Sequence, residues 1–432
     1  MRPTALFRLY KGLSTFALPF TARHGINKLR AAGISIDRAH ERLGHATAER
    51  RAGSLIWFHA ADVDQVKSVP ALIAHITTQT LDTKVLLTSS TAASAQGIAH
   101  DLPQGAVHQF SPFESTGPMK RFLQHWRPDL CVLVGSDLWP NLLDTCANAS
   151  VPVALLDAGL SDSDAQGWKR FPGTADYVLR GIRMAHCQDI RSRNHLRDMG
   201  LAMAQHGAKL NTTVVPTHVD PAARDAAFNA LKGRPIWVAS STHPGEEEQV
   251  LSAHARLLLD HPNLCLILAP HDPERGNAVA TVVQNAGLSV ARSSTGGTLG
   301  DGAQVFLADT KGQTNLWYAL SPIVFQAGTF ANVGGHAPFG AANGHTAILH
   351  GPNYARFSDT YAAFQQQDAS IEVKDSDALA AEIHDLLTHP SRAAQLAARA
   401  RPLAQNGIDL LARLSDQLLS LADTETNETP LQ

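Results

Sequence analysis

A segment in the second half of the chain combines hydroxyl, glycine and histidine side chains in a pattern suited to binding a phosphate. It runs from Ser240 to Glu247, follows an apolar run, and precedes a helix that we expect to begin near Glu246. Exposed N–H groups at a helix start, with hydroxyls nearby, can hold an anion. Ser and Thr at this place are also ordinary N-caps. The candidate phosphate-binding residues are Ser241, Thr242, His243, Gly245 and Glu246.

A second glycine-rich segment, Gly328–His336, follows the apolar run that ends at Ala327. Glycines permit a ligand to approach the backbone closely, although many loop glycines serve only turns. The candidates here are Gly334, Gly335 and His336. Histidines donate readily to phosphate or sugar oxygens, but with 21 histidines in the chain most must lie on the surface or in the core. Two such loops in one half of the chain indicate a nucleotide ligand.

Short acidic motifs are the only other groups that resemble a ligand site. The Asp62–Asp64 triplet and the pair Asp162 and Asp164 look like metal-binding motifs, yet such pairs usually mark turns or helix caps. We therefore predict no metal and no cofactor. No P-loop, G-x-S-x-G elbow or H-E-x-x-H motif occurs, which removes support for an NTPase, a hydrolase of that type or a zinc protease.

The elements that must position these loops are short apolar runs, each followed by a helical stretch. Continuous apolar runs of this length are typical of strands buried on both faces of a parallel sheet. In the first half we predict strands at Ser54–Ala60, Lys84–Ser89, Asp129–Gly135, Val151–Asp157 and Tyr177–Arg180. In the second half we predict strands at Pro235–Ser241, Leu264–Ala269, Val305–Ala308, Pro322–Ala327 and Ala347–His350. The pattern predicts an α/β fold of two doubly wound Rossmann-like domains, with ligands beyond the strands' carboxyl ends, in a cleft between the domains.

The alternation is interrupted between Gly207 and Arg224, where two prolines occur. We expect domains at 31–212 and 223–423, joined by a linker at 213–222. Residues Pro390–Ala422, rich in Ala, Leu and Arg, predict a helix, and 424–432 a disordered polar tail.

Composition restricts the class of protein. The chain has 432 residues, 44% of them hydrophobic, and a formal charge of −3. This length suits two packed domains, and the apolar fraction excludes general disorder. The near-neutral charge argues against a nucleic-acid partner. Four scattered cysteines indicate neither a disulfide framework nor a zinc site, and they favour a reducing compartment.

The amino-terminal segment, residues 1–30, is basic and apolar. Six basic residues and no acidic one occur up to Ile36, and the uncharged run Gly12–Ala22 is too short to span a bilayer. We expect an interfacial membrane anchor, with cationic flanks at anionic headgroups and apolar side chains below them. These side chains are Leu13, Phe16, Leu18 and Phe20. The alternative is a surface helix that packs on the first domain.

The chain as a whole resembles the 3-deoxy-D-manno-octulosonic acid (Kdo) transferase family. The matching motifs keep the family's order along nearly the whole chain. In the first half they are Arg8-Leu9-Tyr10, Glu41-Arg42-Leu43-Gly44, Trp57-Phe58-His59-Ala60, Ser111-Pro112-Phe113 and Leu138-Trp139-Pro140-Asn141. In the second half they are Ser241-Thr242-His243-Pro244-Gly245-Glu246-Glu247, Pro273-Glu274-Arg275 and Gly334-Gly335-His336.

The resemblance implies a GT-B fold with an acceptor-side first domain and a nucleotide-sugar-binding second domain, to which Arg275 would contribute. It implies an inverting, metal-independent transfer of Kdo, or a related sugar, from CMP-Kdo to a lipid A precursor in lipopolysaccharide synthesis. It also implies a peripheral or monotopic protein on the cytoplasmic face of the bacterial inner membrane.

Several positions depart from the family's pattern. The family's catalytic glutamate falls at Gln65, an amide that takes no proton at neutral pH. A family arginine falls at Gly159, the ribose-binding glutamate at Gly340, and an Arg-His pair at His271-Asp272. Backbone-shaping residues persist while charged ones change.

Three interpretations follow from these departures. In the first, the chain is an active transferase whose base is Asp64 or Asp137. In the second, it is a catalytically impaired relative that binds lipid or a partner protein and regulates the pathway. In the third, it is a transferase with a changed donor or acceptor.

Overall fold

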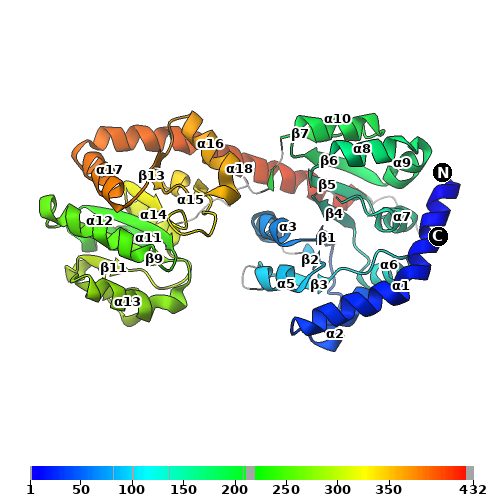
Figure 1. The fold of residues 1–432 in the computed structure, drawn as a ribbon, viewed down its shortest axis with the longest axis horizontal. Coiled ribbons are helices and arrows are strands. Elements are labelled where there is room, and N and C mark those ends of the chain that lie inside the picture. Colours follow the sequence, from blue (N-terminus) through cyan, green and yellow to red (C-terminus); the bar gives the residue numbers. More distant parts are fainter. Residues whose placement is uncertain are drawn as a thin grey trace. The chain divides into compact units, whose positions relative to one another are not determined.

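The computed structural model describes residues 2–80, 82–99, 102–135, 137–207, 209–210 and 219–424. The chain forms two compact units (Figure 1). The first unit contains Met1–Val215 and Asp409–Gln432, and the second contains Pro216–Ile408.

The first unit is built on a parallel seven-stranded sheet with the strand order β3-β2-β1-β4-β5-β6-β7. Its strands are β1 (Leu55–Ala60), β2 (Lys84–Ser89), β3 (Ala106–Phe110), β4 (Leu130–Val134), β5 (Val153–Ala158), β6 (Ile182–Cys187) and β7 (Gln205–His206). Its helices are α1 (Ala5–Ala31), α2 (Ile36–His40), α3 (Val63–Ser68), α4 (Pro70–Gln79), α5 (Ala92–Ile98), α6 (Thr116–Trp126), α7 (Pro140–Asn148), α8 (Asp162–Lys169), α9 (Pro172–Leu179) and α10 (Ile190–Asp198).

Both faces of this sheet are buried, which explains the continuous apolar runs. Along β1, Leu55 and Trp57 belong to one core cluster with residues of α6 and α7. Ile56 and Phe58 belong to the other core cluster, with residues of α3 and α4. Successive strand side chains point to opposite faces, so one strand supplies both cores.

The second unit repeats the design with the strand order β10-β11-β9-β8-β12-β13-β14, again parallel. Its strands are β8 (Ile236–Thr242), β9 (Cys265–Pro270), β10 (Val290–Arg292), β11 (Val305–Leu307), β12 (Ile323–Gln326), β13 (Ala347–His350) and β14 (Ile371–Glu372). Its helices are α11 (Pro221–Leu231), α12 (Glu247–Asp260), α13 (Gly276–Asn285), α14 (Thr314–Leu320), α15 (Phe339–Asn343), α16 (Ser358–Gln366), α17 (Ser376–Thr388) and the start of α18 (Pro390–Thr424). Two doubly wound Rossmann-like units confirm the predicted fold class.

Helix α18 corrects the predicted domain boundary. We expected the second domain to continue to residue 423, but the chain from Asp409 onward belongs to the first unit. Leu411, Leu414 and Leu418 are fully buried there, in the same core cluster as Ile56 and Phe58 of β1. The helix itself is predicted correctly. Residues 213–218 of the expected linker and residues 425–432 of the expected tail, 424–432, lie outside the described residues.

Nine of the ten predicted strands coincide with observed ones. The strand predicted at Tyr177–Arg180 is wrong, because Tyr177 to Leu179 form the end of α9 and the strand follows at β6. No strand was predicted at β3, β6, β7, β10 or β14.

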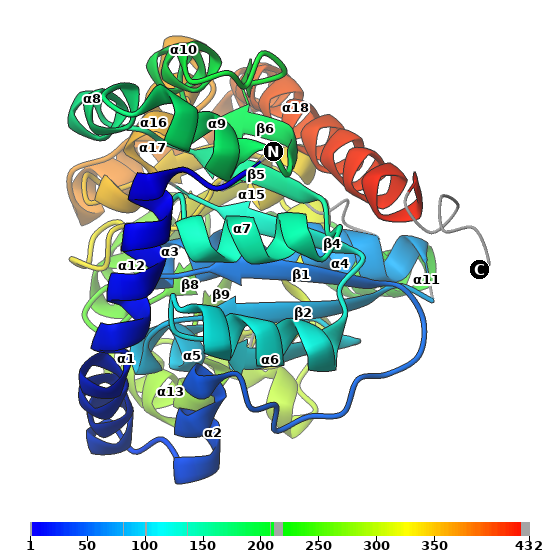
Figure 2. The ribbon, with the colours of Figure 1, turned by 90° about the vertical axis from the view of Figure 1, so that its right-hand side faces the viewer.

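Helix α1 lies along the outside of the first unit (Figure 2). The α1 side chains Phe7, Ala22 and Leu29 are buried against the rest of the first unit. The Lys11 ammonium group lies 2.7 Å from the Asp144 carboxylate. One face of α1 therefore packs on the first unit, while Leu13, Phe16 and Phe20 remain exposed. None of the helices that the structure describes between residues 2 and 424 has the length and apolar character of a membrane span.

Candidate functional site

The loop after β8 is shaped by a distortion at the end of that strand. The register between β8 and β9 shifts between Ser240 and Thr242, and Ser241 has a left-handed φ of 61°. The chain then continues through Gly245 into α12, which begins at Glu247, as predicted. Among the residues that the structure describes, the N-cap residue Glu246 makes no side-chain cap hydrogen bond to the N–H groups at the start of α12. These N–H groups and the open space beside Gly245 fit an anionic ligand.

Glu246 connects this loop with the glycine-rich loop after β12. Its carboxylate is fully buried and accepts hydrogen bonds from the backbone N–H of His243 (3.0 Å) and Gly328 (2.7 Å). It also accepts from the N–H groups of Thr329, Phe330 and Ala331. Five backbone donors therefore satisfy the carboxylate, which fixes the two loops against each other.

Thr242 and Arg275 meet at a second buried carboxylate. The Thr242 hydroxyl donates to Glu247 Oε1 at 3.1 Å, and an Arg275 Nη donates to the same oxygen at 2.8 Å. The Glu247 side chain is 2% exposed and that of Arg275 is 25% exposed. The partly exposed guanidinium remains within reach of a ligand, whereas Thr242 is buried.

The imidazoles of His243 and His336 lie together, with 2.9 Å between their Nε2 atoms. His271, at the end of β9, joins them with ring centroids at 4.9 Å and 4.7 Å. Burial, followed by the nearby His271, lowers the pKa of His243, and the same causes lower the pKa of His336 to about 3. Gly334 and Gly335 precede His336 with φ values of 87° and 83°. The structure thus brings the two predicted histidines together and adds His271, which sequence reasoning treated only as a changed position.

In the first unit, Gln65 lies at the carboxyl ends of two neighbouring strands. Asp62 caps α3 by accepting from the Gln65 N–H at 2.8 Å, and Gln65 Oε1 accepts from the Ala61 N–H at 2.7 Å. The Gln65 side chain packs against Gly135, where a Cβ atom would collide with its amide. Gln65 therefore lies where β1 and β4 end, a usual place for a site in a parallel sheet.

The two predicted bases are both exposed. Asp64 is on the first turn of α3, and Asp137 follows β4. Asp137 lines a pocket of about 450 Å³ with Leu138, Leu160 and Trp168 among its other walls. The described contacts place Gln65 beside Gly135, two residues before Asp137.

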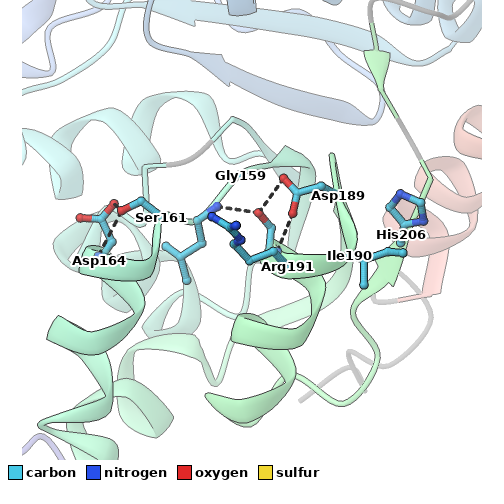
Figure 3. Close-up of a pocket in the computed structure, with 9 residues that line it drawn as sticks. Gly159, Ser161, Asp164, Asp189, Ile190, Arg191 and His206 are labelled. Carbon is cyan, nitrogen blue, oxygen red and sulfur yellow. Dashed lines mark hydrogen bonds between the residues drawn. The ribbon is translucent and has the colours of Figure 1, made fainter. Parts of the chain in front are cut away.

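A larger pocket, of about 710 Å³, lies where β5 and β6 end (Figure 3). Gly159 and Ser161 line it after β5, and Asp189 and Arg191 line it after β6. Ser192 holds the two walls together, because its hydroxyl accepts from the Leu160 N–H at 2.9 Å and lies 3.2 Å from Asp189 Oδ2. Arg191 is exposed, and its guanidinium nitrogen lies 3.4 Å from a carboxylate oxygen of Asp162. Gly159 contributes no side chain to the pocket, so the guanidinium of Arg191 is a cationic group in its lining.

Asp157, at the end of β5, is a carboxyl group that sequence reasoning did not select. Its backbone has a left-handed φ of 55°, and its Oδ1 atom is buried without a hydrogen-bond partner among the described residues. Burial raises the pKa of Asp157 to about 6. Unfavourable backbone geometry and a raised pKa often mark functional positions.

Comparison with known proteins identifies the family. The family model described as 3-deoxy-D-manno-octulosonic-acid transferase (kdotransferase) matches residues 37–212. A probable mitochondrial 3-deoxy-D-manno-octulosonic acid transferase of Arabidopsis thaliana is 29% identical over 84% of this chain and 83% of its own length. The 3-deoxy-D-manno-octulosonic acid transferase of Haemophilus influenzae is 26% identical over 84% of this chain and 86% of its own.

A solved structure is also similar in sequence to part of this chain. The C-terminal CMP-Kdo binding domain of WaaA from Acinetobacter baumannii is 30% identical, covering 43% of this chain and 97% of that domain, with a TM-score of 0.41. The family model covers most of the first unit, and the relatives extend over most of the chain. The chain therefore belongs to the Kdo transferase family of glycosyltransferases.

Proposed function

We propose that the protein transfers Kdo, or a closely related sugar, from CMP-Kdo to a lipid A-type acceptor in lipopolysaccharide synthesis. The observation that carries this proposal is the phosphate-type site of the second unit. It combines the uncapped start of α12, the open space at Gly245 and the loop that ends at His336. The 30% identical Acinetobacter baumannii domain, described as binding CMP-Kdo, supports the choice of donor.

In the proposed reaction, a carboxylate of the first unit removes the proton of the acceptor hydroxyl. The hydroxyl oxygen attacks the anomeric carbon of Kdo, the bond from that carbon to the CMP phosphate oxygen breaks, and the configuration inverts. Ser241, the N–H groups at the start of α12 and Arg275 stabilise the negative charge on the departing phosphate. The step does not itself require a metal ion, because these groups can carry that charge.

Gln65 makes the identity of the base the main question. Its amide oxygen accepts from the Ala61 N–H, and an amide cannot remove a proton. Asp64 and Asp137 are the candidate bases because both follow the same strand ends as Gln65. Loss of a general base typically costs a factor of about 100 to 10,000 in rate.

The test measures product by mass spectrometry from CMP-Kdo and a lipid A precursor, with the natural protein and Gln65→Glu. We expect slow product formation by the natural protein and a rate increase of about 100-fold or more in Gln65→Glu. Gln96→Glu, an exposed position on α5, adds the same charge elsewhere and should leave the rate unchanged. Asp64→Asn and Asp137→Asn then identify the base, since the correct one abolishes the natural protein's slow rate.

One observation favours a second candidate, a relative that binds without catalysis. Gly340 stands where the family's ribose ligand is expected, and a Cβ atom there would lie only 3.1 Å from the Tyr318 ring. The position is therefore packed against protein. If neither the natural protein nor Gln65→Glu forms product, and CMP-Kdo at high concentration does not raise the melting temperature, this second function replaces the first. A ligand at 100 times its Kd would stabilise the fold by about 2.7 kcal/mol.

We further propose that the protein works at the cytoplasmic face of the bacterial inner membrane and binds that surface through α1. Five apolar side chains on α1 recur at helical spacing and remain exposed: Leu6, Leu9, Leu13, Phe16 and Phe20. We call them the α1 stripe. These exposed apolar side chains and the neighbouring cationic side chains suit an interface of anionic lipids. The 710 Å³ pocket beside Arg191 would then receive an anionic group of the lipid acceptor.

A further inference from the structure

Three histidines of the second unit converge in a way that the transfer reaction does not require. His243 follows β8, His271 follows β9 and His336 lies in the loop after β12, and these three strands are neighbours in the sheet. One side-chain nitrogen from each lies within 4.8 Å of the other two. Within the part of the chain that the structure describes, no other group of three histidine, cysteine or acidic residues has this spacing.

We propose that His243, His271 and His336 form a binding site for a divalent transition-metal ion of the zinc type. Imidazole nitrogen is a preferred ligand of zinc, copper and nickel, whereas magnesium and calcium prefer oxygen. Three histidine ligands leave a fourth position of a tetrahedral ion open for water or an anionic group. The site depends on its own geometry and not on the proposed Kdo transfer.

The distances suit such an ion after small side-chain rotations. With metal–nitrogen bonds of about 2.0–2.1 Å, the ligand nitrogens of a tetrahedral site lie about 3.3 Å apart. The Nε2 atoms of His243 and His336 are 2.9 Å apart, slightly closer than this. His271 is exposed and the other two are half-buried, so an ion can enter from the side of His271.

The backbone around the cluster fixes all three ligands. Glu246 holds the N–H of His243 and the loop that leads to His336, as described above. The His271 N–H donates to the Thr242 carbonyl at 3.0 Å, which joins β9 to the same strand end. The His336 ring lies against Gly328, where a Cβ atom would be 2.6 Å from its Cδ2. Ligands held in this way lose little freedom when an ion binds.

The experiment titrates the full chain, freed of metal with a chelator, with Zn²⁺ by calorimetry and with Co²⁺ by visible absorption. We expect one tight site per chain and the absorption of a tetrahedral Co²⁺ complex. His271→Ala removes an exposed ligand and should weaken binding by more than about 100-fold, beyond the loss expected for a residue that only orients a ligand. His271→Cys keeps a ligand and should restore binding with a changed Co²⁺ spectrum.

His384→Ala is the matched control, because His384 lies 3.2 Å from His261 in a different histidine pair of the same unit. It should bind Zn²⁺ as tightly as the natural chain. Absence of a tight site in the natural chain overturns the proposal. So does unchanged binding in His271→Ala, or a loss of binding in His384→Ala. If His271→Ala lowers the melting temperature, His271→Gln is titrated in its place and judged by the same criteria.

Discussion

At the scale of single residues, Asp157 makes a clear prediction about pH. Its folded pKa of about 6 lies above the ordinary value of 3.8, so the folded state holds the proton more tightly than the unfolded state. Stability therefore falls as the pH rises from about 4 to about 6, and the full penalty, up to about 3 kcal/mol, is present at pH 7.

Asp157→Asn removes this titration and keeps a side chain that tolerates the left-handed backbone. We expect a higher melting temperature of the first unit at pH 7 and little difference from the natural protein near pH 4. Calorimetry at several pH values measures this. Asp37→Asn, at an exposed position on α2, is the control and should show no such pH-dependent gain. Equal melting temperatures of Asp157→Asn and the natural protein at pH 7 would show that the buried carboxylate does not lower the stability of the first unit.

Residue types alone did not reveal which polar groups face a ligand and which face the protein. The motif around Ser241 was correctly placed at a strand end. However, the Glu246 carboxylate faces backbone N–H groups. The Glu247 carboxylate faces Thr242 and Arg275. Such contacts join segments that are far apart in the sequence. The same reason hid the cluster that includes His271, because its members come from three separate loops.

At the scale of elements, the strands buried on both faces were predictable and the edge strands were not. Central strands such as β4 and β9 are continuously apolar because helices cover both sides. Strand β6 contains the polar residues Arg183 and His186, which interrupt its apolar run. The end of α9, just before it, is a stronger apolar run and was therefore predicted as the strand, which is wrong. The edge strands β7 and β14 have two residues each, too few for any pattern.

The α1 stripe makes the prediction at this scale. The combined substitutions Leu13→Ser, Phe16→Ser and Phe20→Ser should lower binding to vesicles of anionic phospholipid by at least about 10-fold, since even one of these apolar side chains contributes about 1.5–3 kcal/mol when it is fully buried. These side chains are 60%, 79% and 74% exposed, so the melting temperature should not change. Vesicle sedimentation measures the binding.

The control for this experiment removes exposed apolar side chains from the second unit. Phe228→Ser and Leu259→Ser change residues that are 64% and 83% exposed, on α11 and α12. Vesicle binding by this control should equal that of the natural protein. If both variants bind vesicles equally well, α1 is only a packed surface helix.

At the scale of the whole molecule, α18 connects the two cores. Its first part packs in the second unit, where Ala393 and Leu396 are buried, and its last part supplies Leu411, Leu414 and Leu418 to the first. Sequence patterning predicted the helix but not its division, because apolar residues recur at helical spacing in both parts.

Leu414→Ala should therefore destabilise the first unit, although the residue follows the second unit in the chain. A fully buried leucine replaced by alanine costs about 2–5 kcal/mol. Leu386→Ala on α17, also buried, is the matched change in the second unit. In calorimetry the two substitutions should lower different transitions. If both substitutions lower the melting temperature of the same transition, the division of α18 between the two units is wrong.

Because the last part of α18 belongs to the first unit, it also determines the order in which the two units can fold during synthesis. When the ribosome has finished residue 215, the first unit still lacks the leucines of α18, which are translated only after residues 216–408. At 5–20 residues per second, this delay is on the order of 10 s or more. During synthesis, the second unit can complete its sheet first, while the apolar surface that α18 later covers in the first unit is still exposed.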